Sequence, residues 1–333
     1  MEQLFGLDPL IFAFVVSALC FSFLNGFNDS ANSVATMISS RAMRPRQALL
    51  MSAAAHFVGP FLFGVAVAST IGEKVVASYA ATIPVVWSAL LGAIVWNLMT
   101  WLLGIPSSSS HALVGGIVGA AITGYGTEAI KPGGMIKIVL TLFTSPLVGL
   151  IAGYLLMKCV LFLAGGATPR INTFFKKSQV LTATVLALSH GTNDAQMTMG
   201  VVMMGLLAGG TISAFVVPTW VVAVCAGAIA LGTAIGGWRV IRTLGGKFYR
   251  IRPIHSFTSQ LASASIILGA ALIGGPVSTS HIVSATILSA GAGERMNMVR
   301  WGVMKSIITA WLLTIPASAA IAALFYLLLQ GWE

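Results

Sequence analysis

The chain carries one pattern of motifs twice, and this internal repeat constrains its fold more than any other feature. Three landmarks of the first half recur in the same order in the second half, at offsets of 165, 170 and 170 residues. They are 26-GFNDSANSVAT-36 with 191-GTNDAQMTMGV-201, 105-IPSSSSHALVGG-116 with 275-GPVSTSHIVSAT-286, and the proline of 144-TSPLVG-149 with that of 314-TIPASA-319. A nearly constant offset over three landmarks predicts two structural repeats of one kind.

Long apolar segments fill both halves. Only 8% of the 333 residues are charged, 57% are hydrophobic and the mean hydropathy is +0.94, whereas soluble domains carry about 25% charged residues. This composition excludes a soluble enzyme and a disordered chain, and it predicts a polytopic membrane protein. The apolar segments lie at about 9–40, 47–71, 84–104, 105–123, 138–163, 179–205, 218–238, 257–275, 276–292 and 306–330.

The number of segments per half predicts how the halves are related. Each half holds five, and an odd number of crossings turns the second half upside down in the membrane. Loop charges agree, because loop 41–47 carries three arginines and its counterpart 206–215 carries none. Loop 72–83 has balanced charges, whereas its counterpart 238–256 carries five basic residues. Basic loops that change places in this way are expected of an inverted repeat, because cytoplasmic loops hold the excess of Lys and Arg.

The predicted fold class is therefore an all-α polytopic membrane protein with two inverted-topology repeats of about five membrane segments each. Residues 1–163 form the first repeat, 164–178 a cytoplasmic connector and 179–333 the second repeat. The fourth and ninth segments are short and open with proline, which predicts broken or re-entrant helices. Ten spans put both termini outside. The net charge of +10 then reflects cytoplasmic loops rather than a nucleic-acid partner.

Two carboxylates differ in position from all the others. Of the eight Asp and Glu residues, only Asp29 and Asp194 lie within apolar segments, at equivalent positions of the repeats. Burying such a charge in a bilayer costs roughly 2.5–3.5 kcal/mol on insertion scales, so we interpret both as cation sites rather than as helix caps. The Gly and Asn residues of 26-GFND-29 and 191-GTND-194 predict helix interruptions whose free carbonyls help to coordinate a cation.

Two hydroxyl-rich segments form a second constellation. A proline opens each segment and is expected in the first turn of a helix, where free N–H groups and the positive dipole end attract an anion. Serine capping or small-residue helix packing is the competing interpretation. Repetition of the cluster, closed each time by a histidine, favours the anion site. The anion-binding candidates are Ser107, Ser108, Ser109, Ser278, Thr279 and Ser280, with Asn28 and Asn193 beside them.

Other polar residues in apolar surroundings are candidates for cation or proton coupling. A histidine suits a proton carrier, because imidazole titrates near neutral pH, although a lone buried histidine can equally be hydrogen-bonded packing. The hydroxyl cradle and the carboxylates together predict transport of a tetrahedral oxyanion with protons, sodium or a divalent metal. The coupling candidates besides the two aspartates are His56, Gln260, His111, His281 and Asn25, with Asn97 of the same kind.

At these residues the sequence resembles the inorganic phosphate transporter (PiT) family, over nearly the whole chain. The resemblance rests on the two Asn-Asp pairs, on both hydroxyl-rich segments and on 237-GWRVIRTLGGKFYRIRPIHSFTSQLASA-264. It implies symport of inorganic phosphate through an inverted-repeat core. It also implies that Asp29 and Asp194 lie at cation sites and that the serines of 107–109 and 278–280 contact phosphate.

The resemblance also bears on the coupling ion. Sodium-coupled members typically have a Glu at the position of His56 and another at that of Gln260, and this sequence has neither. The chain is similar to the bacterial low-affinity, proton-coupled branch, which is associated with neutral metal–phosphate complexes. We therefore expect import of phosphate across the inner membrane with H⁺, with Na⁺ as the alternative, and with Mg²⁺ or another divalent ion as a co-substrate. A related sulfate branch leaves sulfate open as the anion.

Two functions of other classes stay open from the residues alone. A membrane-embedded hydrolase would use the intramembrane Ser, His and Asp residues, although catalysis does not require their duplication across an inverted repeat. An anion channel would bind the same anion without uphill accumulation. We expect a transporter that is not an enzyme, has no resident cofactor, and contacts phosphate, a coupling cation and the lipid bilayer. The sequence leaves a homo-oligomer open.

Overall fold

The computed structural model describes residues 6–330, which form twelve α-helices and three 3₁₀ turns without a β-strand. This confirms the predicted all-helical membrane architecture. The first six helices are α2 (Pro9–Ser39), α3 (Pro45–Leu62), α4 (Ala66–Lys74), α5 (Ile83–Leu103), α6 (Ser109–Tyr125) and α7 (Pro132–Leu163). The next six are α8 (Ile171–Ala208), α9 (Thr219–Ile235), α10 (Trp238–Gly246), α11 (Pro253–Leu272), α12 (Thr279–Glu294) and α13 (Trp301–Gln330). The 3₁₀ turns are Ser78–Ala80, Thr127–Ala129 and Met296–Met298.

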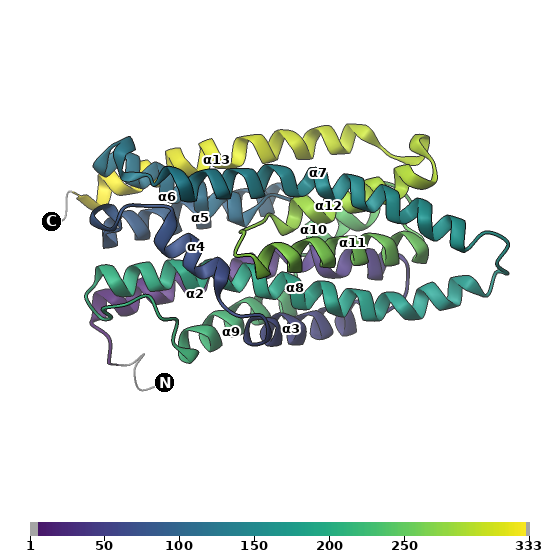
Figure 1. Cartoon of the computed structure of the whole chain (residues 1–333), viewed down its shortest axis with the longest axis horizontal. Coiled ribbons are helices and arrows are strands. Elements are labelled where there is room, and N and C mark those ends of the chain that lie inside the picture. The colour runs from purple at the N-terminus through teal and green to yellow at the C-terminus, as the bar shows by residue number, and fades with distance from the viewer. Residues whose placement is uncertain (1–5, 331–333) are drawn as a thin grey trace.

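The second six helices repeat the first six. Each set has a long first helix, a bent pair, two helices joined by an extended segment, and a long last helix with an internal proline. The bent pairs α3–α4 and α9–α10 turn by 73° and 68°. In Figure 1, α2 and α8 run in opposite directions along the long axis, and so do α7 and α13. The second repeat is thus inverted relative to the first.

The predicted helix interruptions at the two Asp motifs are wrong. Helices α2 and α8 continue through 26–29 and 191–194. The glycines permit close helix packing instead, because a Cβ on Gly26 would lie 2.1 Å from the Ile229 carbonyl oxygen of α9. A Cβ on Gly191 would lie 2.5 Å from the Cα of His56 in α3. Ligands for a cation at these motifs therefore come from side chains rather than from an unwound backbone.

The actual breaks precede the short helices α6 and α12, which have 17 and 16 residues. Ser108 and Ser278 are their N-caps, and each hydroxyl accepts a hydrogen bond from the backbone N–H three residues later. The prolines lie two positions before the caps, in extended backbone. The prediction of a first-turn proline is therefore wrong, because the serine caps begin the helices after the extended Pro segments.

Helices α6 and α12 begin next to each other inside the molecule. The rings of His111 and His281, in their first turns, have centroids 4.4 Å apart. From there α6 runs toward the end at which α7 begins, and α12 runs toward the opposite end, at which α13 begins (Figure 1). The positive dipole ends of two helices thus meet in one region.

Four helices of the described chain, α2, α5, α7 and α13, are long and apolar enough to cross a membrane, and the two bent pairs raise the number to six. Ten segments are predicted from the sequence. The difference arises because α6 and α12 are shorter than a span of about 20 residues, and because α8 and α11 carry many polar residues. Exposed leucines on α7 and α13, such as Leu140, Leu155 and Leu312, fit a surface that faces lipid.

Two segments predicted as loops are partly helical. Helix α8 begins at Ile171, inside the predicted connector 164–178, and α10 lies inside the predicted loop 238–256. In Figure 1, α2 begins and α13 ends at one end of the molecule, and the α7–α8 connection lies at the other. The termini themselves, 1–5 and 331–333, lie outside the described residues.

Candidate functional site

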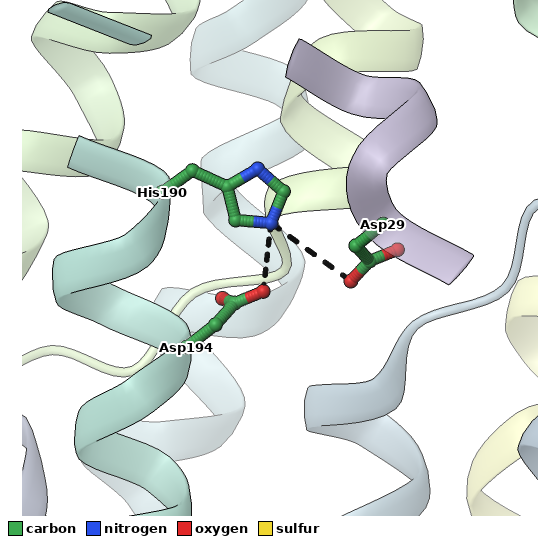
Figure 2. A group of neighbouring side chains, drawn as sticks. All are labelled: Asp29, His190 and Asp194. Atoms are coloured by element: carbon green, nitrogen blue, oxygen red, sulfur yellow. Dashed lines mark hydrogen bonds and ion pairs between the residues drawn. The ribbon is translucent and has the colours of Figure 1, made fainter. Parts of the chain in front are cut away.

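Three buried side chains meet between α2 and α8, as Figure 2 shows. His190 Nε2 lies 2.7 Å from Asp194 Oδ2 and 4.0 Å from Asp29 Oδ2. One ligand atom from each residue lies within 4.8 Å of the others. Within residues 6–330, no Lys or Arg forms an ion pair with either carboxylate, so His190 is the one basic side chain that pairs with them. We call these three residues the Asp–His–Asp cluster.

Helical geometry explains the placement of the cluster. His190 and Asp194 are four residues apart on α8, so they lie on one face of that helix. Asp29 lies on α2, which packs directly against α8. Two carboxylates buried together repel each other unless a positive charge is shared between them. The imidazole of His190 lies where it can supply that charge.

A chain of hydrogen bonds leads from the cluster to α3 and α9. Ser33 Oγ lies 3.3 Å from His190 Nδ1 and 3.2 Å from His56 Nε2. His56 Nδ1 lies 2.8 Å from Thr233 Oγ1, and the Thr233 hydroxyl donates to backbone carbonyls of α2 and α9. The chain therefore joins the cluster to a histidine that the sequence singles out.

The donors in this chain determine where its protons lie. Because Thr233 donates to carbonyl oxygens, it accepts from His56 Nδ1–H, and the second nitrogen of a neutral His56 accepts from Ser33. Ser33 then accepts from His190 Nδ1–H, while His190 Nε2–H donates to Asp194. The cluster thus combines one imidazole with two carboxyl groups.

The start of α12 supplies hydroxyl donors to both carboxylates. Ser280 Oγ donates to Asp29 Oδ1 at 2.7 Å, and Thr279 Oγ1 donates to Asp194 Oδ2 at 3.4 Å. Ser278 instead caps α12 and does not reach the cluster. The structure therefore brings Thr279 and Ser280 of the second hydroxyl-rich segment to the carboxylates.

The equivalent segment of the first repeat does not reach the carboxylates. Ser107 Oγ lies 2.7 Å from a threonine hydroxyl of α5, and Ser108 Oγ lies 2.7 Å from the ring of His111. Ser109 is buried in the first turn of α6. Ser110 reaches the other segment, because its hydroxyl donates to a backbone carbonyl just before α12, at 3.1 Å.

The two asparagines beside the aspartates also differ. Asn193 Nδ2 donates to Asp194 Oδ1 at 2.8 Å and to the carbonyl of Val277 at 3.1 Å, so it ties the carboxylate to the segment before α12. Asn28 instead donates to the backbone carbonyl of Asn97, at 3.3 Å. Buried polar atoms without a hydrogen-bond partner are uncommon in proteins. Several such atoms lie on α2 and α5, the helices that carry Asn28 and Asn97. They are the side-chain oxygens of Asn25, Asn28 and Asn32 and both polar atoms of the Asn97 side chain.

The two histidines that close the hydroxyl-rich segments form a separate aromatic group. The ring of His281 stacks on Trp311, with centroids 3.9 Å apart, and His111 meets Phe143 edge to face. Nε2 of His281 is buried without a hydrogen-bond partner. Within the described residues neither histidine pairs with a carboxylate of the cluster.

Gln260 belongs to a second polar network. Its Oε1 accepts from Thr182 at 2.7 Å, and its Nε2 donates to Thr36 at 3.0 Å. Thr36 lies seven residues after Asp29 on α2, which is about 10 Å along a helix axis. Of the two positions at which the resemblance led us to expect Glu in a sodium-coupled protein, only that of His56 is connected to the cluster by these hydrogen bonds.

Sequence reasoning missed His190, Ser33 and Ser110. His190 stands directly before the GTND motif, at the position equivalent to Asn25 in the first repeat. Position-by-position comparison of the repeats could have found it, because both equivalents are polar. Ser33 follows Asp29 by one helical turn and therefore shares its face of α2. Ser110 could be told from its neighbours only once the start of α6 was known.

The chemistry of the cluster suits a proton or a small cation. Carboxylate oxygens are ligands for Na⁺ and Mg²⁺, and imidazole binds protons and transition metals. All three residues are buried. The neighbouring hydroxyls donate hydrogen bonds, as an oxyanion requires. The region thus combines ligands for a cation with donors for an anion.

The sequence profile of the phosphate transporter family matches residues 25–322. The chain belongs to the phosphate transporter family. It is 43% identical over 320 residues to a probable low-affinity inorganic phosphate transporter of Bacillus subtilis, with 95% of this chain and 96% of that protein covered. A relative of the same description from Rhizobium meliloti is 41% identical over 320 residues, with 96% of each chain covered.

A solved structure of a sodium-dependent phosphate transporter has the same fold, with a TM-score of 0.87 and 24% sequence identity. The match covers 97% of this chain and 99% of that one. Membership of the phosphate transporter family agrees with the family expected from the sequence motifs. The family match spans both repeats and includes every residue of the Asp–His–Asp cluster.

Proposed function

We propose that the protein is a secondary transporter that imports inorganic phosphate with protons. The observation that carries the proposal is the contact of the Asp–His–Asp cluster with the hydroxyls that begin α12. Family membership supports phosphate as the anion. The histidine between the carboxylates, and its connection through Ser33 to His56, support the proton as the coupling ion.

Competition for hydroxyl protons provides the coupling. The Ser280 hydroxyl has one proton to donate, and in this structure it is donated to Asp29. When Asp29 is protonated it becomes a donor itself, and the Ser280 proton is free for a phosphate oxygen. Thr279 has the same relation to Asp194. Protonation of the carboxylates thus prepares the phosphate site, and it also removes negative charge that would repel the anion.

The proposed cycle follows the inverted-repeat architecture. With the site open to the outside, the carboxylates take up protons and phosphate then docks at the start of α12. One part of the molecule next rocks against the other and opens the site inward. A divalent ion such as Mg²⁺ is proposed as a co-substrate that enters bound to phosphate. We place the chain in the inner membrane, with the α7–α8 connector inside and both termini outside.

Uptake into proteoliposomes tests the proposal. We expect phosphate accumulation under an inward proton gradient without sodium, and competition by arsenate but not by sulfate. Uptake that requires a sodium gradient would contradict proton coupling, and equal competition by sulfate would contradict the anion assignment. Repeating the assay with and without magnesium tests the co-substrate. Flux without uphill accumulation would indicate a channel, and ester hydrolysis without flux would indicate an enzyme.

A further inference from the structure

Two pockets at opposite ends of the molecule are related by the repeat. The first, of about 500 Å³, is lined by the end of α2 and by the segments before α11 and α13. The second, of about 600 Å³, is lined by the end of α8 and by the segments before α5 and α7. Because α2 and α8 run in opposite directions, the first lies at the end with the α7–α8 connection (Figure 1). We call it the connector pocket and the second the terminal pocket.

The two pockets differ in charge. The terminal pocket has one acidic and one basic lining residue, Glu73 and Lys131. The connector pocket has four arginines and no carboxylate; the arginines are Arg41, Arg250, Arg252 and Arg300. The repeat therefore explains why equivalent segments line the two pockets, but it does not explain the positive charge of the connector pocket.

Most of this positive charge has no partner. Glu294 lines a second pocket that shares Arg250, Arg252 and Arg300 with this one, and it accepts hydrogen bonds from Arg252 and from His255. In the described part of the chain, no carboxylate forms an ion pair with the other three arginines, Arg41, Arg250 and Arg300. An uncompensated cationic pocket attracts anions.

An excess of basic residues at a cytoplasmic end is expected in any membrane protein. That tendency does not require arginines from three separate loops to line one pocket, nor does it favour Arg over Lys. Arg has a planar fork that binds phosphate through two hydrogen bonds at once. The backbone is also held in place, since Arg300 N–H donates to the Phe248 carbonyl at 3.0 Å and joins two of the three loops.

We propose that the connector pocket binds a phosphate group, as an anion site separate from the Asp–His–Asp cluster, and we assign inorganic phosphate as its source. The three loops connect directly to α2, α11 and α12. Two of these helices, α2 and α12, carry the transport-site residues Asp29 and Ser280. A phosphate held by arginines of all three loops joins these helices and resists their relative movement. Given the proposed transport function, phosphate that accumulates on the connector side therefore slows further import.

Equilibrium dialysis of radiolabelled inorganic phosphate against the purified full-length protein, in a neutral detergent, tests the site. The variant is Arg250→Gln with Arg300→Gln. The matched control is Arg170→Gln with Arg242→Gln, which removes the same charge from exposed arginines outside the pocket. We expect two classes of phosphate site in the wild type and the control. In the pocket variant one class weakens by about tenfold or more. Ser280→Ala weakens the other class.

Equal binding by the pocket variant and the control overturns the proposal, whether or not the protein transports phosphate. Uptake into right-side-out membrane vesicles preloaded with phosphate tests the consequence. Internal phosphate should slow uptake by the wild type and the control but not by the pocket variant. Equal slowing of all three proteins would contradict the inference that phosphate in the connector pocket slows import. If the pocket variant loses retention of phosphatidylglycerol while its binding of inorganic phosphate is unchanged, the pocket holds a lipid headgroup and the assignment to free phosphate is wrong.

Discussion

Asp29 and Asp194 occupy equivalent positions of the two repeats but have different surroundings. One turn before Asp194 stands His190, which donates to it, and beside it Asn193 ties it to the segment before α12. One turn before Asp29 stands Asn25, whose side-chain oxygen is buried without a partner. The repeat thus supplies two carboxylates at matching places, and a single Asn-to-His difference places a histidine between them, closer to Asp194 than to Asp29.

The hydroxyl-rich segments show the same imbalance. The second segment contacts both carboxylates, through Thr279 and Ser280, whereas Ser110 of the first segment reaches only a backbone carbonyl. The second repeat therefore contributes the hydroxyl contacts to both carboxylates, whereas the first contributes Asp29 and, through Ser33, the connection to His56. The symmetry of the fold brings the two carboxylates together, and the departures from symmetry give them different partners. Four predictions test this division of roles.

The largest effect is expected from the carboxylates. Asp29→Asn and Asp194→Asn should each reduce proton-driven phosphate accumulation in proteoliposomes to background. Each variant lacks a carboxyl group that can bind and release the coupled proton. The affinity of the wild type for phosphate should depend on pH more strongly than the ionisation of phosphate alone explains. In Asp29→Asn this additional pH dependence should disappear. Proton-driven accumulation at the wild-type level in either variant would show that the carboxylates do not couple transport.

Changing His190 to Asn makes the second repeat resemble the first. A hydrogen bond to a charged group contributes about 1.5–3 kcal/mol, so His190→Asn should lower the uptake rate by roughly tenfold to a hundredfold and flatten its pH profile. The double variant Asn25→His with His190→Asn is the control for position. The uptake rate of the double variant should stay as low as that of His190→Asn, because Ser33 and His56 connect to the position of His190 only. Full recovery would show that a histidine on either side of the site is sufficient.

A smaller difference is expected between two serines at the equivalent position of the hydroxyl-rich segments. Ser280→Ala removes a donor to a carboxylate, whereas Ser110→Ala removes a donor to a neutral carbonyl. Charge-assisted hydrogen bonds are roughly twice as strong as neutral ones. The KM for phosphate should rise by about tenfold in Ser280→Ala and by about threefold in Ser110→Ala. Equal effects would mean that both segments hold phosphate alike.

Much of this arrangement could be predicted from the sequence. The repeated landmarks and the exchange of basic loops predicted the inverted repeat, and the cost of a charge in an apolar segment singled out Asp29 and Asp194. The continuity of α2 and α8 could not be predicted in the same way. Glycine next to asparagine suits both an unwound segment and a close helix contact, and the neighbouring helices that decide between them are far away in the sequence.

The contribution of each serine depends on a similar detail. Which hydroxyl points to the carboxylates is set by the residue that caps the helix, and a shift of one position would turn a different side chain to the site. The sequence therefore identified the segment containing Thr279 and Ser280 but not their separate contacts. His190 could not be predicted from the repeat for another reason, because it lies just before the shared GxND motif, at a position where the two repeats differ.

The smallest effect on transport, but a clear effect on stability, is expected from the glycine of the first repeat. Gly26→Ala would place a Cβ 2.1 Å from the Ile229 carbonyl oxygen, so α2 and α9 must separate. Overpacking of this kind costs about 1–3 kcal/mol, and the Tm of the detergent-solubilised protein should fall by several degrees. Gly227→Ala on α9 is the control, because nothing lies within 4 Å of the added Cβ.

Gly191→Ala should lower the Tm similarly but also impair uptake, because the added Cβ meets the backbone of His56. Equal loss of uptake in Gly26→Ala and Gly191→Ala would indicate that both repeats contribute alike to coupling, against the asymmetry argued above.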